Sequence, residues 1–255
     1  MYQADIPLTV TYNPTLVTLS ILIAVVASYT ALNLTGQVTI AKGRSRVAWL
    51  IGGAVTMGIG IWSMHFVAML AFSLPMPINY NVWTVVFSIL PAIVASGGAL
   101  FLTSRRVLNI QELLIGGVLM GIGIASMHYT GMAAMQMEAR TQYDPLVFML
   151  SIGSAIGASI VALWMAFELR MHTSKTGKHL KIFSAFLMGA AISAMHYIGM
   201  ASASFTQTKV AVAPATQVMQ ASQTWLAISI GIATLVILSL TILIPTYTNS
   251  QANKP

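Results

Sequence analysis

The sequence contains no cysteine and very little charge. Without cysteine, the chain cannot form disulfides, thiolate metal sites or a thiol nucleophile. Only 7% of its 255 residues are charged, whereas a soluble globular domain carries about 25%. Hydrophobic residues make up 57% of the chain, and the mean hydropathy is +0.82. This composition is typical of a protein embedded in a lipid bilayer, and the net charge of +7 does not indicate nucleic-acid binding.

Acidic residues are scarce as well. The chain has five, and its apolar segments contain neither a carboxylate pair nor a Ser-His-Asp arrangement with a buried acid. We therefore predict that the chain is not an enzyme. The first fourteen residues hold one acid and no base, whereas a cleaved signal peptide begins with positive charge. We expect 1–14 to be a short external N-terminus.

Seven apolar segments are long enough to cross a bilayer, because a membrane helix needs about 20 such residues. We predict an all-α integral membrane protein in which 1–14 and 206–224 are external, 15–205 form the main membrane domain, 225–244 form a seventh helix and 245–255 form a cytoplasmic tail. The predicted spans are 15–34, 47–72, 83–102, 113–135, 146–167, 182–205 and 225–244.

The basic residues predict the orientation. Ten of the twelve lie in the first, third and fifth connections and the tail, whereas Arg140 and Lys209 alone lie in the others. Cytoplasmic loops are enriched in Lys and Arg, so the N-terminus is expected outside and the C-terminus inside. The fifth connection, 168–181, also holds His172 and His179, which we interpret as part of a solvated cytoplasmic anchor.

One motif occurs three times, on alternate predicted helices. It reads MGIGIWSMHFVAM at 57–69, MGIGIASMHYTGM at 120–132 and MGAAISAMHYIGM at 188–200. The repeat predicts three equivalent helix pairs followed by a final helix. A single intramembrane histidine can be a hydrogen-bonded packing residue, but three in one register favour a functional site. The glycines of each motif predict close helix packing.

Helix geometry arranges the side chains of each motif. Positions four apart share a face, so each histidine has a methionine beside it on the outer side. The methionine just before each histidine points about 100° away from it. Both sets are candidate ligands, and the histidines are expected in the outer halves of their helices. The candidate metal ligands are His65, His128, His196, Met69, Met132, Met200, Met64, Met127 and Met195.

Imidazole and thioether together favour copper. Thioether sulfur is a soft ligand that selects Cu(I), and imidazole also binds copper. Zinc is disfavoured because methionine is not among its usual ligands, and the missing carboxylates disfavour magnesium, calcium and manganese. Haem is the main rival because His and Met are both axial ligands, although three equivalent histidines fit it awkwardly.

The motifs resemble the MHYT family of bacterial integral membrane proteins. Residues 127–130 spell Met-His-Tyr-Thr, and the other copies keep Met and His but read MHFV at 64–67 and MHYI at 195–198. The resemblance implies a bacterial inner-membrane sensor of a diatomic gas (oxygen, carbon monoxide or nitric oxide) that uses copper held by the Met and His residues near the outer face. It also implies signalling through diguanylate cyclase, phosphodiesterase or histidine-kinase domains.

Two other functions remain open at this point. The same ligands suit copper transport or delivery if they form a path, and Met57, Met120 and Met188 lie deeper in their helices. A haem-binding electron-transfer protein is the third alternative. Since the sequence ends soon after the seventh helix, we expect the sensor to act through a separate cytoplasmic signalling partner.

Overall fold

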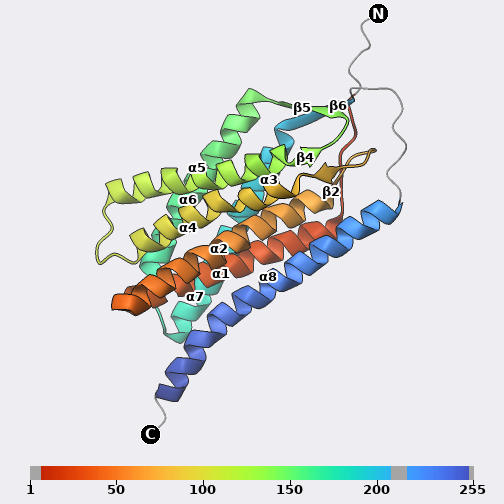
Figure 1. The fold of residues 1–255 in the computed structure, drawn as a ribbon. Coiled ribbons are helices and arrows are strands. Elements are labelled where there is room, and N and C mark those ends of the chain that lie inside the picture. The colour runs from red at the N-terminus through yellow and green to blue at the C-terminus, as the bar shows by residue number, and fades with distance from the viewer. Residues whose placement is uncertain (1–6, 208–216, 253–255) are drawn as a thin grey trace, which may run out of the picture.

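The computed structural model describes residues 7–207 and 217–252. Seven spans in this part of the chain are long and apolar enough to cross a membrane, which confirms the predicted seven-helix membrane fold (Figure 1). The third span consists of two helices, α3 and α4. The helices are α1 Pro14–Ile40, α2 Gly43–Ala71, α3 Val82–Phe87, α4 Ile89–Thr103, α5 Ile110–Ala133, α6 Pro145–Leu169, α7 Lys175–Ala201 and α8 Gln217–Ala252.

Six of these spans form a closed ring. Each neighbouring pair in the order α1, α2, α4, α5, α6, α7 is in contact, and α7 packs back against α1. The motif helices α2, α5 and α7 therefore alternate with α1, α4 and α6, which we call the partner helices. Helix α8 lies outside the ring against α1 and α2 (Figure 1). The ring therefore consists of three repeated pairs, each with one partner helix and one motif helix.

The partner helices carry a repeat of their own, which our sequence analysis missed. They share the pattern A-x-x-A-S-x-x-A-L at 24–32, 92–100 and 155–163. Its small residues admit the motif helices closely. A Cβ at Gly58, for example, would overlap the backbone of Ile93, and the two equivalent glycines face α6 and α1 in the same way. The predicted close packing at the motif glycines is thus confirmed.

The third span breaks at Ser88, where we predicted one continuous helix. Pro91 has no N–H to donate to the carbonyl of Phe87 one turn earlier, and α3 ends at that residue. The Ser88 hydroxyl instead donates to the Val85 carbonyl at 2.7 Å, and the indole N–H of Trp62 lies 3.1 Å from both oxygens. The proline therefore explains the break, and Trp62 of α2 binds the Val85 carbonyl and the Ser88 hydroxyl beside it.

Three short two-stranded sheets close one end of the ring. β1 (Thr11–Tyr12) pairs with β2 (Phe72–Ser73), β3 (Asn79–Tyr80) with β4 (Met135–Gln136), and β5 (Ala139–Tyr143) with β6 (Ala203–Gln207). Each sheet joins the strand before a partner helix to the strand after the motif helix of the same repeat. The hydropathy pattern predicts only helices, because strands of two to five residues are too short to give a recognisable pattern.

Each sheet leads into a capped helix. Asn13, Asn81 and Asp144 accept hydrogen bonds from the first backbone amides of α1, α3 and α6, which stabilises the helix starts. Their own backbone amides donate to the carbonyls of Ala71, Ala134 and Ser202 at 2.8–2.9 Å. The cap thus ties the start of each partner helix to the end of its motif helix.

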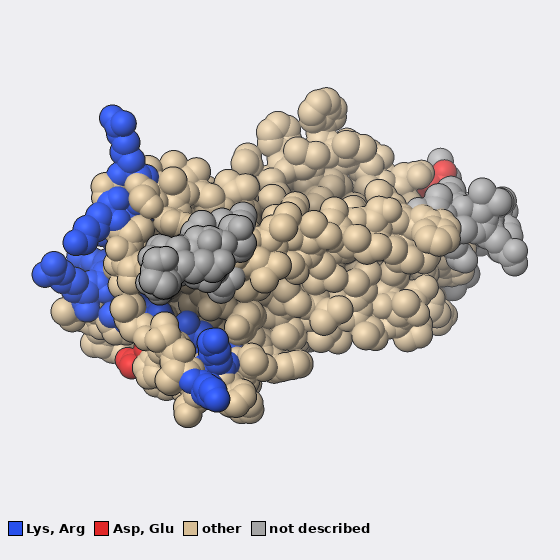
Figure 2. All heavy atoms as spheres, turned by 90° about the horizontal axis from the view of Figure 1, so that it is seen from below, with Lys and Arg blue, Asp and Glu red and all other residues tan. Residues whose placement is uncertain are grey.

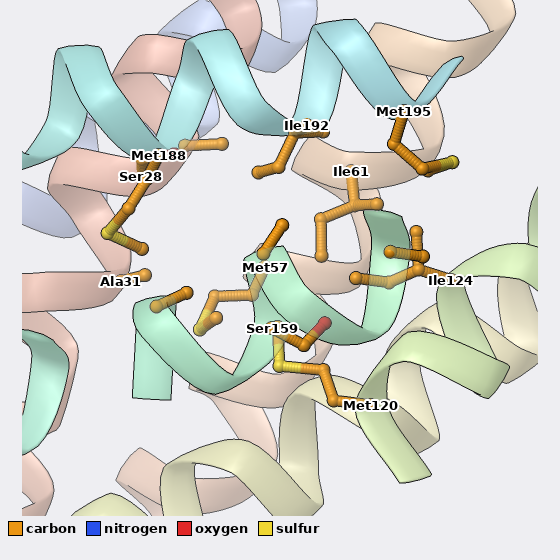
Figure 3. Close-up of a pocket in the computed structure, with 14 residues that line it drawn as sticks. Ser28, Ala31, Met57, Ile61, Met120, Ile124, Ser159, Met188, Ile192 and Met195 are labelled. Carbon is orange, nitrogen blue, oxygen red and sulfur yellow. The ribbon is translucent and has the colours of Figure 1, made fainter. Parts of the chain in front are cut away.

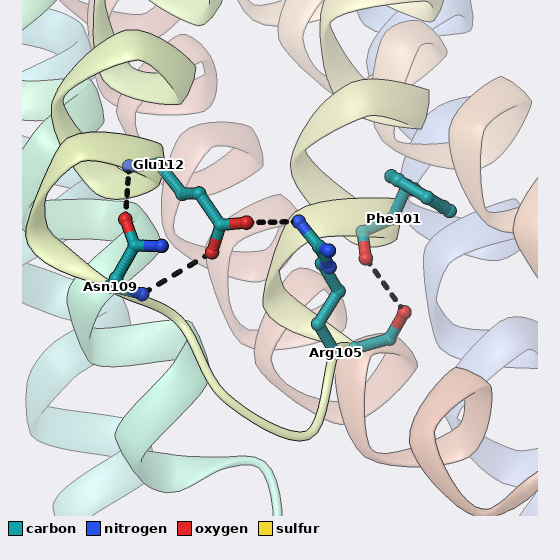
Figure 4. A network of polar contacts seen from close by, with 5 residues as sticks. Phe101, Arg105, Asn109 and Glu112 are labelled. Carbon is teal, nitrogen blue, oxygen red and sulfur yellow. Dashed lines mark hydrogen bonds and ion pairs between the residues drawn. The ribbon is translucent and has the colours of Figure 1, made fainter.

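The opposite end of the bundle is basic. Lys and Arg side chains gather there, as Figure 2 shows in blue, which is the cytoplasmic side by the positive-inside rule. Helix α5 begins at this end with a capping box, in which the side chains of Asn109 and Glu112 each accept a hydrogen bond from the backbone amide of the other. Glu112 also forms an ion pair with Arg105 (Figure 4).

Several helices extend beyond the spans that hydropathy predicts, and α1, for example, continues to Ile40 through half of the expected first connection. α7 begins at Lys175, so Lys178 and Lys181 lie on the helix rather than in a loop, and the Ser174 hydroxyl caps it by accepting from the Gly177 amide at 3.1 Å. α8 begins at Gln217, within the segment expected as an external loop, and continues to Ala252 through most of the expected tail. Hydropathy marks the apolar part of a helix, whereas the helix itself continues to its cap.

Candidate metal centre

Three histidines, one from each motif helix, meet inside the ring. The Nδ1 atom of His65 lies 3.0 Å from that of His196 and 3.2 Å from that of His128. The ring centres are 4.8, 5.0 and 5.1 Å apart, so the imidazoles form a nearly equilateral triangle. All three side chains are at most 1% exposed. The structure therefore brings the three predicted ligands to one point.

The arrangement of the three imidazole rings suits a bound cation. A neutral histidine has one N–H and one acceptor nitrogen, so a proton on Nδ1 of His65 can serve only one of its two contacts. If the protons lie on Nε2 instead, three lone pairs converge. Three nitrogens each about 2.0 Å from one ion and evenly spread around it lie about 3.5 Å apart, close to the observed spacing. The donor set thus fits a metal ion bound through Nδ1.

The far side of each ring is tightly packed. None of the three Nε2 atoms has a hydrogen-bond partner among the described residues. A Cβ at Gly131 would collide with Nε2 of His65, and one at Gly199 with Nε2 of His128. Ala68 occupies the equivalent position in the first motif. The absence of a side chain at Gly131 and Gly199 therefore makes space for the imidazoles of His65 and His128.

Gly131→Ala is expected to weaken copper binding about tenfold or more, as changes behind a metal ligand commonly do. The added methyl group would push the His65 ring out of the triangle. Copper affinity, measured by competition with a chelator, checks this. Ala68→Gly is the matched control and should leave copper affinity unchanged. An unchanged affinity in Gly131→Ala would contradict the orientation inferred for His65.

The two sets of candidate methionines lie in different surroundings. Met69, Met132 and Met200 share one buried apolar cluster with Phe72 and Phe205 of the sheets, one helical turn beyond the histidines. By contrast, Met64, Met127 and Met195 lie in three separate clusters between helices. The structure therefore brings the first set together over the histidines and keeps the second set apart.

The aromatic residue after each histidine links neighbouring helices, a role that the sequence did not reveal. The Tyr129 hydroxyl is 2.5 Å from Ser151 of α6, and the Tyr197 hydroxyl is 3.5 Å from Ser20 of α1. The first motif has Phe66 there, and its equivalent serine, Ser88, binds Trp62 instead. The first motif can thus have Phe in place of Tyr because Trp62 supplies the hydrogen bond to the serine.

The sheets add a second aromatic layer. Tyr12, Tyr80 and Tyr143 pack edge-on against Tyr197, Phe66 and Tyr129, with ring centres 5.6–5.9 Å apart. Burial raises the pKa of Tyr12 to about 12, with a smaller contribution from Tyr197. Burial also raises the pKa of Tyr80 and of Tyr143. This layer therefore stays neutral across physiological pH and covers the aromatic residues that follow the histidines.

An apolar cavity of about 40 Å³ lies in the bundle on the basic side of the histidines. The side chains of Met57, Met120 and Met188 surround it from three helices (Figure 3). Ser159 also lines it, and its buried hydroxyl has no partner among the described residues. The cavity has room for a water-sized or diatomic molecule.

His65, His128 and His196 form the one cluster of potential His or carboxylate metal ligands found in the described ranges. A comparison with protein families supports the reading of the motifs. The family model of the bacterial signalling protein N-terminal repeat, MHYT, matches residues 1–52, 58–116, 121–177 and 189–251. The chain belongs to the MHYT family. The match includes the seventh helix, which we had placed outside the repeats, and the MHYT fold makes the chain a multi-pass protein of the bacterial inner membrane.

Known MHYT relatives are longer signalling proteins. The chain is 46% identical over 91% of its length to the bifunctional diguanylate cyclase/cyclic di-GMP phosphodiesterase MucR of Pseudomonas aeruginosa. It is 45% identical over 77% to signaling protein YkoW of Bacillus subtilis, and 41% identical over 75% to the cyclic di-GMP phosphodiesterase NbdA of P. aeruginosa. It spans 33%, 24% and 24% of these relatives. No solved structure matches it.

Proposed function

We propose that this MHYT chain senses a diatomic gas or the redox state through a copper ion held by His65, His128 and His196. The observation that carries the proposal is the convergence of three buried histidines, with Nδ1 of His65 at 3.0 Å from that of His196 and 3.2 Å from that of His128. Met69, Met132 and Met200 stand over the triangle as further ligands. Bound copper would supply the group that responds to the gas or to redox change.

The chain's own residues would carry that response across the membrane. Each histidine sits beside an aromatic residue, and Tyr129 and Tyr197 reach serines on the next partner helices. A shift of a motif helix is therefore passed to its neighbour and to the basic end. MucR and NbdA are named for cyclic di-GMP synthesis or hydrolysis. We infer that the domain signals to a cytoplasmic diguanylate cyclase, phosphodiesterase or kinase and is not itself catalytic.

Haem suits this geometry less well than copper. Ring nitrogens 3.0 Å apart leave no gap for a porphyrin between two axial histidines. The test is metal analysis and an optical spectrum of the purified protein after copper loading. About one copper per chain without a Soret band supports the proposal. A Soret band assigns the protein to the haem class, and the absence of stoichiometric metal overturns the proposal.

Copper transport is the second candidate, and the cavity ringed by Met57, Met120 and Met188 favours it. These thioethers lie between the histidines and the basic end, where a path for Cu(I) would need them. The variant Met57→Leu/Met120→Leu/Met188→Leu separates the two functions. A transporter should lose most of its copper flux in vesicles, whereas a sensor should bind copper at the histidines as the wild type does.

A further inference from the structure

The three equivalent junctions at the basic end of the ring differ in polarity, and the one between α7 and α1 stands apart. Lys181 stands fifteen residues before its histidine, where the other motif helices have Leu50 and Leu113. Asn33 stands five residues after the partner-helix serine, where the others have Phe101 and Trp164. Phe101 and Trp164 are both exposed on the membrane-facing surface. Two equivalent junctions are thus apolar, and the third is polar and basic.

A cavity of about 360 Å³ occupies this polar junction between α1, α7 and α8. Asn33 and Gln37 of α1 line it together with Thr241 of α8. The side-chain amide of Asn33 donates to the Tyr29 carbonyl at 2.8 Å, and this is its one hydrogen bond among the described residues. Pockets of this volume bind molecules of the size of a lipid headgroup or a nucleotide.

The two lysines at this cavity have no acidic partner among the described residues. Lys181 is 6% exposed, and neither it nor Lys178 has an ion-pair partner among the described residues. The two lysines are three residues apart on one helix face, where like charges repel. Arg170 folds over the Phe167 ring, donates to the Phe167 carbonyl and interacts with Glu168, but its buried Nε atom has no partner among the described residues. Glu168, the nearest acid in sequence, is exposed and does not line the cavity.

From these observations we infer that the cavity binds a phosphate-bearing anion, with Lys181, Lys178 and Arg170 as the cations that recognise it. The site lies at the cytoplasmic end, where the headgroups of anionic lipids lie and basic pockets between helices take up their phosphates. A buried lysine without an acidic partner at a helix end is a candidate for binding an anion. The depth of the cavity favours a lipid headgroup as the molecule that carries the phosphate. A soluble phosphate compound is the alternative.

The test measures ligand binding to the full chain in mild detergent by native mass spectrometry and by the shift of the unfolding temperature. Phosphatidylglycerol is compared with phosphatidylcholine, and cyclic di-GMP and inorganic pyrophosphate are tested in separate samples. Lys181→Gln and Lys178→Gln should each weaken phosphatidylglycerol binding about fivefold. Lys175→Gln, an exposed position outside the cavity, is the matched control and should bind as the wild type does.

The outcomes separate the sources. Preferential binding of phosphatidylglycerol that the two variants weaken supports a lipid site, whereas binding of cyclic di-GMP or pyrophosphate alone supports a soluble phosphate. Equal binding of both lipids, or equal loss in Lys175→Gln, overturns the proposal. If Lys181→Gln does not fold, Lys178→Gln still tests the site because its side chain is exposed. This inference does not depend on the metal.

Discussion

The variant His65→Ala/His128→Ala/His196→Ala is expected to bind almost no copper, where the wild type binds about one ion per chain. The reason is that it removes all three nitrogens of the triangle, whose closest atoms are 3.0 Å apart. Metal content after copper loading and gel filtration is the measurement. Each single variant should weaken binding by at least about tenfold, since the outer methionines remain but one imidazole ligand is lost.

The triple variant needs a control for its fold. Three alanines leave a cavity, which costs stability. The variant His65→Leu/His128→Leu/His196→Leu fills the space with apolar side chains and removes three Nε2 atoms that have no partner in the described structure. It should fold at least as well as the wild type and still lack copper. Full copper content in this leucine variant would return the histidines to a packing role.

The variant Met69→Leu/Met132→Leu/Met200→Leu should lower the affinity for Cu(I) by at least about tenfold while the unfolding temperature changes little. These methionines share one buried cluster beyond the histidines, and thioether is the ligand that distinguishes Cu(I). Leucine has nearly the same volume, and such exchanges usually cost less than about 1.5 kcal/mol. Competition with a Cu(I) chelator under reducing conditions measures the affinity.

The chain supplies its own control for that experiment. Met64→Leu/Met127→Leu/Met195→Leu changes the same number of thioethers in the same helices. Because these three lie in separate clusters, Cu(I) affinity should stay within about threefold of the wild type. If the two triple variants lose affinity equally, the assignment of Met69, Met132 and Met200 as the nearer set is wrong.

The membrane fold was predictable because composition and segment length determine it. Seven apolar segments require seven helices in lipid, where backbone groups have no other partner. The three histidines were predictable because one register on three helices places them at one depth. Their Nδ1 orientation was not, because ring rotation depends on contacts between repeats, such as Gly131 against His65.

The features that escaped prediction share a cause. The Tyr-Asn and Tyr-Asp pairs at 12–13, 80–81 and 143–144 recur at the same spacing as the partner-helix serines, but they lie outside the apolar runs. This repeat is recognisable only when the polar segments before the partner helices are aligned with one another, because hydropathy does not mark it. Lys181 was assigned to a loop because hydropathy does not show that a charged residue can be buried at a helix end.

In a closed ring every helix is packed between two others, so no helix can move without affecting its neighbours. Every motif helix is held between two partner helices, so a displacement at one histidine strains the junctions of all three repeats at once. Packed interfaces of this kind switch between discrete arrangements instead of deforming gradually. The ring should therefore respond as a single cooperative unit, with a threshold, even though the chain is one polypeptide. Helix α8 lies outside the ring but is held to motif helix α2, where the Thr234 hydroxyl donates to Ser63 at 2.7 Å, so it should move with the ring.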